Sequence, residues 1–192
     1  SIAERFGHDE IRVSHEQNLI LPHVAETDLR AVYDGLVAAE LATANAGFIT
    51  DIIACPGLDY CALANARSIP VAQRISQRFG DIARQREIGD LKIKISGCIN
   101  ACGHHHVGHI GILGVEKNGE EFYQITIGGR ADEQAQMGTL IGPAVPYAEV
   151  ADVVEDIVEA YLALRDSKEE LFIDTVKRLG VEPFKERVYA TR

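Results

Sequence analysis

The sequence has no apolar run long enough to span a lipid bilayer, no internal repeat and no low-complexity linker. Its N-terminus lacks the basic-then-apolar pattern of a secretory signal. Positive charge is scarce, since 19 basic residues stand against 29 acidic ones and the formal net charge is −10. These absences argue against a membrane protein, a secreted protein and non-specific binding to nucleic acid. We expect a cytoplasmic protein with neither a membrane nor a nucleic acid as partner.

The composition that is present is that of an ordinary globular protein. The 192 residues are 46% hydrophobic and 25% charged, which suits one large domain or one and a half small ones. The chain opens at Ser1 without an initiator Met, and Ile11–Leu21 already has the pattern of a domain interior. We therefore expect a fragment of a longer protein.

Charge is unevenly distributed along the chain. Residues 62–94 carry seven Lys or Arg and three acidic residues, whereas residues 131–160 carry seven acidic residues and no Lys or Arg. A locally basic segment in an acidic protein indicates a local anionic ligand. For most of these arginines, and for the acidic segment, we favour a solvated helix face.

Hydrophobic periodicity predicts a mixed α/β fold. Extended segments are predicted at Ile11–Ser14, Leu19–Leu21, Phe48–Ala54 and Leu91–Ile95 (half-buried), with a hairpin of Ile110–Val115 and Phe122–Ile127 around Asn118-Gly119. Helices are predicted at Asp28–Ala44 (capped by Thr27), Leu58–Ser68 (started by Pro56 and interrupted by Pro70), Val71–Ile82, Tyr147–Leu164 and Ser167–Leu179, the last with Ser167 and Glu170 as a capping box.

Four cysteines form two pairs, and each pair lies beside glycine where a predicted strand ends. Five residues separate Cys55 from Cys61, and three separate Cys98 from Cys102. Four thiolates at two such junctions can hold zinc or an iron–sulfur cluster. The wide first pair favours the cluster, because structural zinc sites use shorter spacings. Disulfides and four buried free thiols are the remaining alternatives, and a reducing compartment disfavours disulfides.

At these cysteines the sequence resembles a known family. The segment CPGLDYC (55–61), followed by SGCINACG (96–103), resembles the Cys-x5-Cys … Cys-x3-Cys signature of the sirohaem-dependent sulfite and nitrite reductases. Residues 12–19 are similar to the segment that opens the second half of these enzymes, and the glycine pair 128–129 resembles theirs. Residues 104–115 look most like bacterial sulfite reductase haemoproteins.

The resemblance implies a [4Fe-4S] cluster with Cys55, Cys61, Cys98 and Cys102 as ligands, and it implies sirohaem. By position, Cys102 is also the axial ligand of the sirohaem iron. The residues implied to contact the cofactors are Cys102, Asn100, Ser96, Gly97, Gly103, His104, Gln17 and Asn18. The backbone N–H groups around Gly57, Gly97 and Gly103 suit hydrogen bonds to cluster sulfides. No catalytic residue is implied, because the family's substrate-binding Arg and Lys residues belong to the other half.

Four histidines lie within six residues, at positions 104, 105, 106 and 109. One interpretation is a second metal site. Consecutive histidines in a strand point to alternate faces, however, and cannot all converge on one ion. We favour one histidine near the cofactor, at His104, with the others packed or solvated.

The resemblance also implies a domain organisation. Residues 1–48 are similar to half of a ferredoxin-like domain, and residues 49–192 to a sirohaem- and [4Fe-4S]-binding domain whose mixed sheet is covered by helices. Family members are much longer and have two pseudo-symmetric halves, of which this chain resembles the C-terminal one. The missing N-terminal half is therefore an implied partner, and exposed apolar surface on the unpaired part favours self-association.

The implied function is the six-electron reduction of sulfite to sulfide by an assimilatory sulfite reductase haemoprotein. The alternatives are a nitrite reductase of the same family, which forms ammonia, and a zinc-stabilised module without activity. The implied electron donor is a ferredoxin or a flavoprotein. Because sirohaem is held between the two halves of such enzymes, we expect the isolated chain to be inactive.

Overall fold

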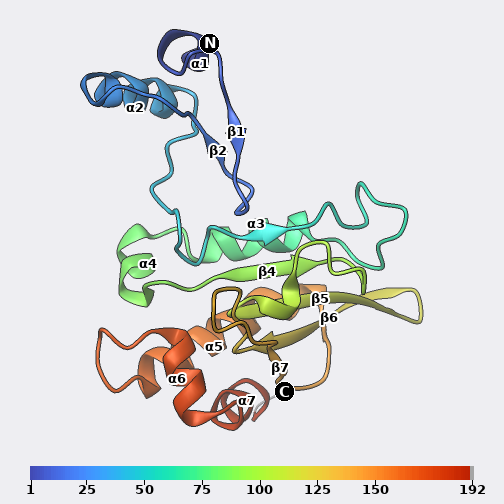
Figure 1. The fold of residues 1–192 in the computed structure, drawn as a ribbon. Helices are drawn as coiled ribbons and strands as arrows, with labels where there is room; N and C mark the ends of the chain where they lie inside the picture. The colour runs from blue at the N-terminus through green and yellow to red at the C-terminus, as the bar shows by residue number, and fades with distance from the viewer. Residues whose placement is uncertain (191–192) are drawn as a thin grey trace. The chain divides into compact units, whose positions relative to one another are not determined.

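A computed structural model describes residues 1–190, and the chain forms two compact units, Ser1–Ala46 and Gly47–Arg192. The predicted mixed α/β class is confirmed, since both units contain helices and strands (Figure 1). No helix among the described residues combines the length and the apolar character needed to cross a membrane.

The first unit consists of two helices and a two-stranded antiparallel ribbon. Its elements are α1 (Ile2–Phe6), β1 (Arg12–Val13), β2 (Leu19–Ile20), the 3-10 helix η1 (Glu26–Asp28) and α2 (Leu29–Ala38). The ribbon pairs Arg12 with Ile20 and Val13 with Leu19. The two predicted extended segments are therefore present, whereas α1 was not predicted.

The predicted helix over Asp28–Ala44 is wrong at both ends. Thr27 lies within η1 rather than capping α2. At the other end, Glu40 adopts a left-handed conformation with a φ of 58°. The N–H of Leu41 then reaches back to the carbonyl of Leu36 at 2.9 Å, and this Schellman-type bond ends the helix.

The second unit is built on a six-stranded mixed sheet in the order β3-β4-β5-β6-β7, with β8 paired to β6. The strands are β3 (Ile53–Ala54), β4 (Ile93–Ser96), β5 (Ile110–Lys117), β6 (Glu120–Ile127), β7 (Thr139–Leu140) and β8 (Val145–Pro146). The pairs β3–β4 and β4–β5 are parallel, and the remaining pairs are antiparallel. The predicted hairpin is present as β5 and β6, but only Ile53–Ala54 of the predicted strand over Phe48–Ala54 pairs.

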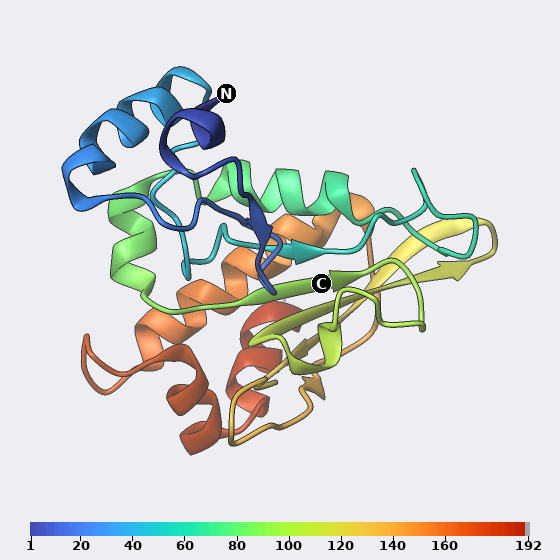
Figure 2. The ribbon, with the colours of Figure 1, turned by 45° about the horizontal axis from the view of Figure 1, so that its top comes forward.

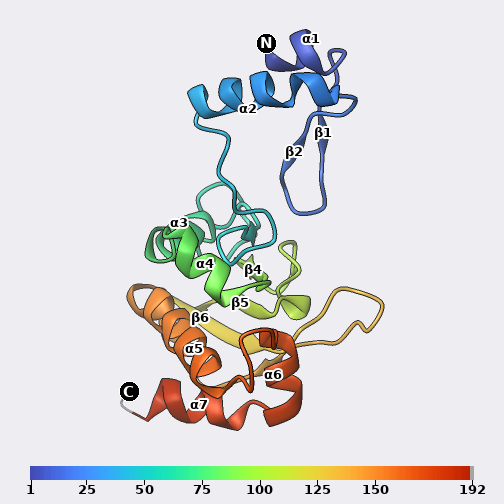
Figure 3. The ribbon, with the colours of Figure 1, turned by 90° about the vertical axis from the view of Figure 1, so that its left-hand side faces the viewer.

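Helices cover the sheet and bury its apolar side chains. They are α3 (Ile69–Arg78), α4 (Ile82–Ile88), α5 (Val150–Leu164), α6 (Phe172–Leu179) and α7 (Glu182–Tyr189), with the 3-10 helices η2 (His105–Val107) and η3 (Tyr147–Glu149). Within this unit α3 and α5 run side by side along one face of the sheet (Figures 2 and 3). The core between them includes five fully buried side chains, those of Ile75, Phe79, Val153, Val154 and Ile157.

The predicted helix over Leu58–Ser68 is absent, and the segment is an irregular loop. Pro70 does not interrupt a helix; it lies in the first turn of α3, where its fixed φ and missing N–H are tolerated. The strand predicted as half-buried is buried along all of β4, and Lys94 is only 8% exposed. Tertiary packing on both faces overrides the apolar–polar alternation there.

The predicted capping box at Ser167 does not form, because α6 begins only at Phe172. The hydroxyl of Ser167 accepts from the N–H of Glu169 in a local turn. Glu170 instead accepts from the Arg178 guanidinium at 2.8 Å. The same carboxylate also accepts from the backbone N–H of Asp166, one residue before Ser167, so it reaches back to the backbone without forming the predicted capping box.

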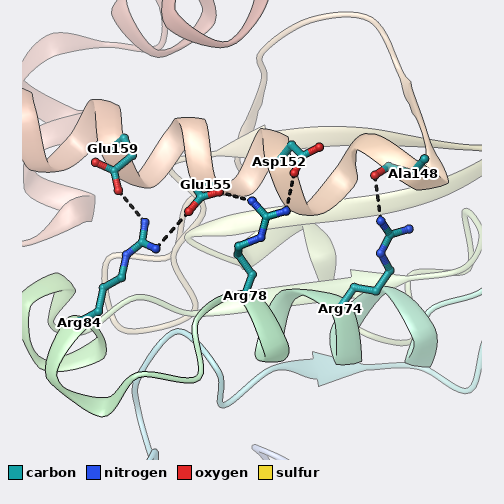
Figure 4. Close-up of polar contacts among 7 residues, drawn as sticks. All are labelled: Arg74, Arg78, Arg84, Ala148, Asp152, Glu155 and Glu159. Atoms are coloured by element: carbon teal, nitrogen blue, oxygen red, sulfur yellow. Dashed lines mark hydrogen bonds and ion pairs between the residues drawn. The ribbon is translucent and has the colours of Figure 1, made fainter.

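The basic and acidic segments of the sequence bind each other across the interface of α3 and α4 with α5 (Figure 4). Arg78 contacts Asp152 at 2.6 Å and also pairs with Glu155. Arg84 contacts Glu155 at 3.0 Å and Glu159 at 2.6 Å. Arg78, Asp152 and Glu159 remain 40%, 50% and 47% exposed, as the interpretation as solvated helix faces expects, but the basic and acidic side chains pair with one another and leave no free basic site for an anionic ligand at these residues. Their charges are met within the protein.

Candidate functional site

The two cysteine-bearing loops begin at the carboxyl ends of adjacent parallel strands. Cys55 follows β3 directly, and Cys98 lies two residues after the end of β4. Ala54 is in register with Ile95, and the N–H of Cys55 donates to the carbonyl of Ile95 at 3.1 Å. Because parallel strands end at the same edge of a sheet, the pairing brings both loops to one place, at the right of Figure 1.

Close backbone packing at glycine joins the loops. The N–H groups of Asn65 and Ala66, from the first loop, donate to the carbonyl of Gly97 in the second at 2.8 and 3.0 Å. A Cβ atom on Gly97 would lie 2.5 Å from the carbonyl oxygen of Ala66, and one on Gly103 would lie 1.9 Å from that of Ile95. No residue with a side chain fits these two positions without moving backbone.

The sulfur of Cys55 is buried and has two polar neighbours. It accepts from the backbone N–H of Gly97 at 3.1 Å. The Oγ atom of Ser68 lies 3.3 Å from the same sulfur. The expected N–H donor at Gly97 is therefore directed at a cysteine sulfur.

The other three cysteines become progressively more accessible. Cys98 is buried, Cys61 is half-buried and Cys102 is exposed. Cys61 lies in a turn, with its N–H on the carbonyl of Gly57 at 2.9 Å, rather than in a helix. Ala101 adopts a left-handed conformation with a φ of 56° and bends the second loop just before Cys102. The four thiols are free, so the disulfide alternative is not realised in this structure.

The turn that carries Cys102 is tied to β4. Ser96 is fully buried, and its hydroxyl accepts from the N–H of Gly103 at 3.1 Å. The N–H of Gly103 is therefore used inside the protein and is not directed at a sulfide. Asn100 and His104 are exposed on the same turn, and His104 has a left-handed φ of 54°. Gln17 and Asn18 lie in the exposed turn between β1 and β2, in the first unit.

His105 and His106 lie in the 3-10 helix η2 and His104 is its N-cap residue, so the strand geometry assumed for the consecutive histidines is wrong. His105 is buried, its Nδ1 atom has no hydrogen-bond partner, and burial and the neighbouring His106 lower its pKa to about 4. The Nδ1 atom of His109 accepts from the N–H of Lys92 at 3.3 Å. Among residues 1–190, no group of three or more His, Cys, Asp or Glu side chains is arranged around a single metal ion.

The structure adds three residues that the sequence did not single out. The hydroxyl of Ser68 lies close to the sulfur of Cys55. Glu121 and Tyr123 of β6 bind the backbone of Arg67, the residue before Ser68. The available signal was the Ser-x-Pro pattern at the start of α3, which predicts a helix cap. It contains no information on a sulfur that lies thirteen residues earlier in the chain.

The donor set fits an iron–sulfur cluster. Four free thiols lie on two loops that start from neighbouring strands, and an N–H donor is already directed at one sulfur. Buried sulfur ligands with N–H donors are characteristic of such clusters. The exposed Cys102 leaves one side of the site open to a second group.

Comparison with known proteins supports this chemistry. Residues 46–192 match the family described as nitrite and sulphite reductase 4Fe-4S domain, and residues 1–39 match the nitrite/sulfite reductase ferredoxin-like half domain. The chloroplastic ferredoxin–nitrite reductase of Zea mays is 28% identical over 181 residues, which cover 88% of this chain and 31% of that protein. The sulfite reductase [ferredoxin] 2 of Mycolicibacterium paratuberculosis is 27% identical over 178 residues, covering 88% and 32%. The chain thus spans about a third of the length of these relatives.

Two solved structures show the same fold. The NirA protein of Mycobacterium tuberculosis matches with a TM-score of 0.78 and 24% identity, covering 95% of this chain and 35% of that one. A dissimilatory sulfite reductase I matches with a TM-score of 0.81 and 15% identity, covering 97% and 64%. The [4Fe-4S] cluster and sirohaem implied by the sequence resemblance are the cofactors of the matched family. With its two cysteine loops at one sheet edge and both domain matches, the chain belongs to the nitrite and sulphite reductase family.

Proposed function

We propose that this chain is the cofactor-binding, C-terminal part of an assimilatory sulfite reductase haemoprotein. Cys55, Cys61, Cys98 and Cys102 are the residues that would hold the [4Fe-4S] cluster, and Cys102 would also serve the sirohaem. The bound cofactors supply the redox chemistry that reduces sulfite to sulfide. The chain's own residues position the ligands, exclude water from the buried sulfurs and donate hydrogen bonds.

The observation that carries the proposal is the N–H of Gly97 donating to the Sγ atom of Cys55. This bond joins the first cysteine loop to the second across two strands that are parallel neighbours. The sulfur of Cys55 is buried away from solvent and accepts a hydrogen bond from the backbone. Buried sulfur ligands of iron are stabilised by hydrogen bonds of this kind.

Exposure supports separate roles for the four ligands. Cys55 and Cys98 are each 7% exposed, which suits sulfurs that contact only the cluster. Cys102 is exposed and follows the left-handed Ala101, so its sulfur is accessible to a second iron. Asn100 and His104, exposed on the same turn, are the side chains we assign to contacts with the macrocycle.

The other cofactor-site residues receive supporting roles. Ser96 and Gly103 hold the Cys102 turn through their mutual hydrogen bond, and Gly97 acts through its N–H. Gln17 and Asn18 remain a prediction from the family resemblance.

We assign residues 1–48 to half of a ferredoxin-like domain and residues 49–192 to the cofactor-binding domain. Apolar side chains that are unusually exposed occur in both. In the first unit Val13 is 75% and Leu19 65% exposed; on the cysteine loops Tyr60 is 78% and Ile99 80% exposed. Apolar surface of this kind indicates an interface. We propose that the N-terminal half of the complete enzyme and the sirohaem cover it.

Iron, acid-labile sulfide and zinc in the chain purified without oxygen test the cofactor assignment. We expect about four irons and four sulfides per chain, with a haem-type absorption band where sirohaem is retained. Cys61→Ser and Cys98→Ser should lose the iron, whereas Met137→Ser, at an exposed position on another loop, should retain it. Zinc without sulfide, in the wild-type chain, would show the zinc-stabilised alternative instead.

The substrate needs a separate measurement, because relatives named for nitrite and for sulfite match almost equally well. We propose sulfite, on the resemblance of residues 104–115 to bacterial sulfite reductase haemoproteins. The complete enzyme, reduced by a ferredoxin or a flavoprotein, should show a higher kcat/KM for sulfite than for nitrite. The reverse order would identify a nitrite reductase. The isolated chain should reduce neither anion.

A further inference from the structure

The hydroxyl of Ser68 lies 3.3 Å from the Sγ atom of Cys55, and both side chains are buried. We propose that Ser68 is a positioning residue that donates a hydrogen bond to the Cys55 thiolate and thereby raises the midpoint potential of the cluster. The inference rests on the proposed function, because it requires the cluster to be bound at Cys55.

The position of Ser68 in α3 makes the contact unusual. Ser68 is the N-cap residue of α3, where a serine hydroxyl ordinarily accepts from the backbone N–H two or three residues later. Here the side chain makes no capping bond. The helix therefore begins without the hydrogen bond that its N-cap residue could supply, and the hydroxyl is directed at a sulfur instead.

The direction of the hydrogen bond follows from the chemistry of the ligand. A cysteine that binds iron is a thiolate and has no hydrogen to donate. The Ser68 hydroxyl must then be the donor and Cys55 Sγ the acceptor. Because Ser68 is 0% exposed, no water competes for its hydroxyl. The Ser68 hydroxyl and the N–H of Gly97 together give the sulfur two hydrogen-bond donors.

The fit around the hydroxyl depends on two glycines. A Cβ atom on Gly57 would lie 2.5 Å from the backbone nitrogen of Ser68. One on Gly97 would lie 3.1 Å from its Oγ atom. The absence of side chains at these positions lets the start of α3 approach the sulfur.

The residue before Ser68 is held on both sides of its backbone by β6. The N–H of Arg67 donates to Glu121 at 2.7 Å, and the carbonyl of Arg67 accepts from the Tyr123 hydroxyl at 2.9 Å. Burial tends to raise the pKa of Glu121, but the donors from Arg67 and Tyr123 outweigh it and keep that pKa below its usual range. The Glu121 carboxylate therefore stays charged near neutral pH, and the bonds of Glu121 and Tyr123 to Arg67 limit the movement of Ser68.

A donor on a ligand sulfur favours the more negative state of the cluster. One-electron reduction adds one negative charge, so hydrogen bonds to sulfur stabilise the reduced form more than the oxidised form and raise the potential. Removing the Ser68 hydroxyl should lower the midpoint potential. A tenfold change in the reduction equilibrium corresponds to about 59 mV for a one-electron couple, and we expect a shift of this order.

The test is a redox titration of the iron-loaded protein with dithionite as the reductant, followed by electron paramagnetic resonance. Iron and sulfide are counted first in the wild type, and a chain without them contradicts the proposed function and, with it, the inference about Ser68. In loaded protein, Ser68→Ala should lower the midpoint potential, and Ser76→Ala, on the same helix, should leave it unchanged. An unchanged potential in loaded Ser68→Ala overturns the inference.

A second measurement covers the case in which Ser68→Ala does not load. Resonance Raman spectra of the loaded wild type are recorded in H2O, soon after transfer to D2O and after complete exchange. A hydroxyl hydrogen exchanges with solvent faster than a buried backbone amide hydrogen, so donation from Ser68 should shift the iron–cysteine stretching modes soon after transfer to D2O. The slower Gly97 N–H should add a further shift only after complete exchange, and the comparison needs no variant. A wild type with no deuterium-sensitive mode of this kind overturns the inference.

Discussion

The Nη2 atom of Arg78 in α3 lies 2.6 Å from Oδ1 of Asp152 in α5, and the other Nη atom of the same guanidinium pairs with Glu155. A basic segment and an acidic segment of the sequence therefore meet at a helix interface (Figure 4). Glu155 is at the centre of the arrangement, because it also accepts from Arg84 at 3.0 Å.

The first prediction concerns this ion-pair network. Burial tends to raise the pKa of Glu155, but bonds from Arg78 and Arg84 outweigh it and lower that pKa. Glu155→Gln should reduce the free energy of unfolding by up to about 1 kcal/mol, since the Arg78 side chain is 40% exposed and partly screened. Urea denaturation at neutral pH measures the loss, which should shrink in about 1 M salt. Glu133→Gln, on an exposed loop, is the control and should change little.

The second prediction concerns Tyr123, whose hydroxyl donates to the carbonyl of Arg67 and lies 3.0 Å from Glu121. The ring is 0% exposed, and burial together with Glu121 raises its pKa. Tyr123→Phe should lower the free energy of unfolding by about 1–3 kcal/mol, because the one hydroxyl hydrogen shared by the Arg67 carbonyl and the Glu121 carboxylate is lost. Denaturant unfolding gives the value. Tyr60→Phe, at a position 78% exposed, should be neutral; equal losses in both variants would contradict the role of the buried bonds.

The third prediction concerns Gly103. A Cβ atom there would lie 1.9 Å from the carbonyl oxygen of Ile95, and backbone cannot move aside as a flexible side chain can. Gly103→Ala should destabilise the protein by about 3 kcal/mol or more and reduce iron loading, because the Cys102 turn must leave β4. Unfolding curves and iron content are measured together. The control is Gly80→Ala, where the nearest atom would be 3.5 Å away, and normal loading of Gly103→Ala would refute the close approach.

The fourth prediction concerns the pH dependence of stability at His105. Burial lowers its pKa from 6.5 to about 4, so the folded protein holds this histidine neutral where the unfolded chain protonates it. The resulting stability is present above pH 6.5 and is lost as the pH falls towards 4. The Tm of His105→Leu should therefore fall less than that of the wild type over this window. His15→Leu, at an exposed position, should follow the wild type, and parallel curves for all three proteins would count against the prediction.

Several elements could be predicted because neighbouring residues decide them. The hairpin turn is one: Asn118 and Gly119 both adopt positive φ, at 56° and 82°, as the Asn-Gly pair of a tight hairpin turn requires. The long amphipathic pattern before Leu164 likewise predicts α5 with its end at the observed residue. The cysteine spacings, read together with their neighbours, indicated the family that the comparisons show.

Other elements escaped prediction, either because distant contacts decide them or because the backbone adopts a conformation that the residue type does not favour. Residues 58–68 have a helical pattern, yet Asn65 and Ala66 give their N–H groups to Gly97, far along the chain, and no helix forms. The helix of the first unit stops early because a local backbone bond to Leu36 closes it at Glu40, a residue type rarely left-handed. The acidic partners of Arg78 likewise lie far along the chain, so the residues around Arg78 do not predict them.

By itself the sequence determined the α/β class, the hairpin, the two cysteine pairs and the family, because backbone preferences and residue spacing act over a few neighbouring positions. Only the tertiary structure decided that Gly97 and Ser68 converge on the sulfur of Cys55 and that Arg78 meets Asp152. These contacts depend on the register of β3 with β4 and on the packing of α3 against α5. Such pairings are made through space between residues far apart in the chain, where no local pattern specifies the partner.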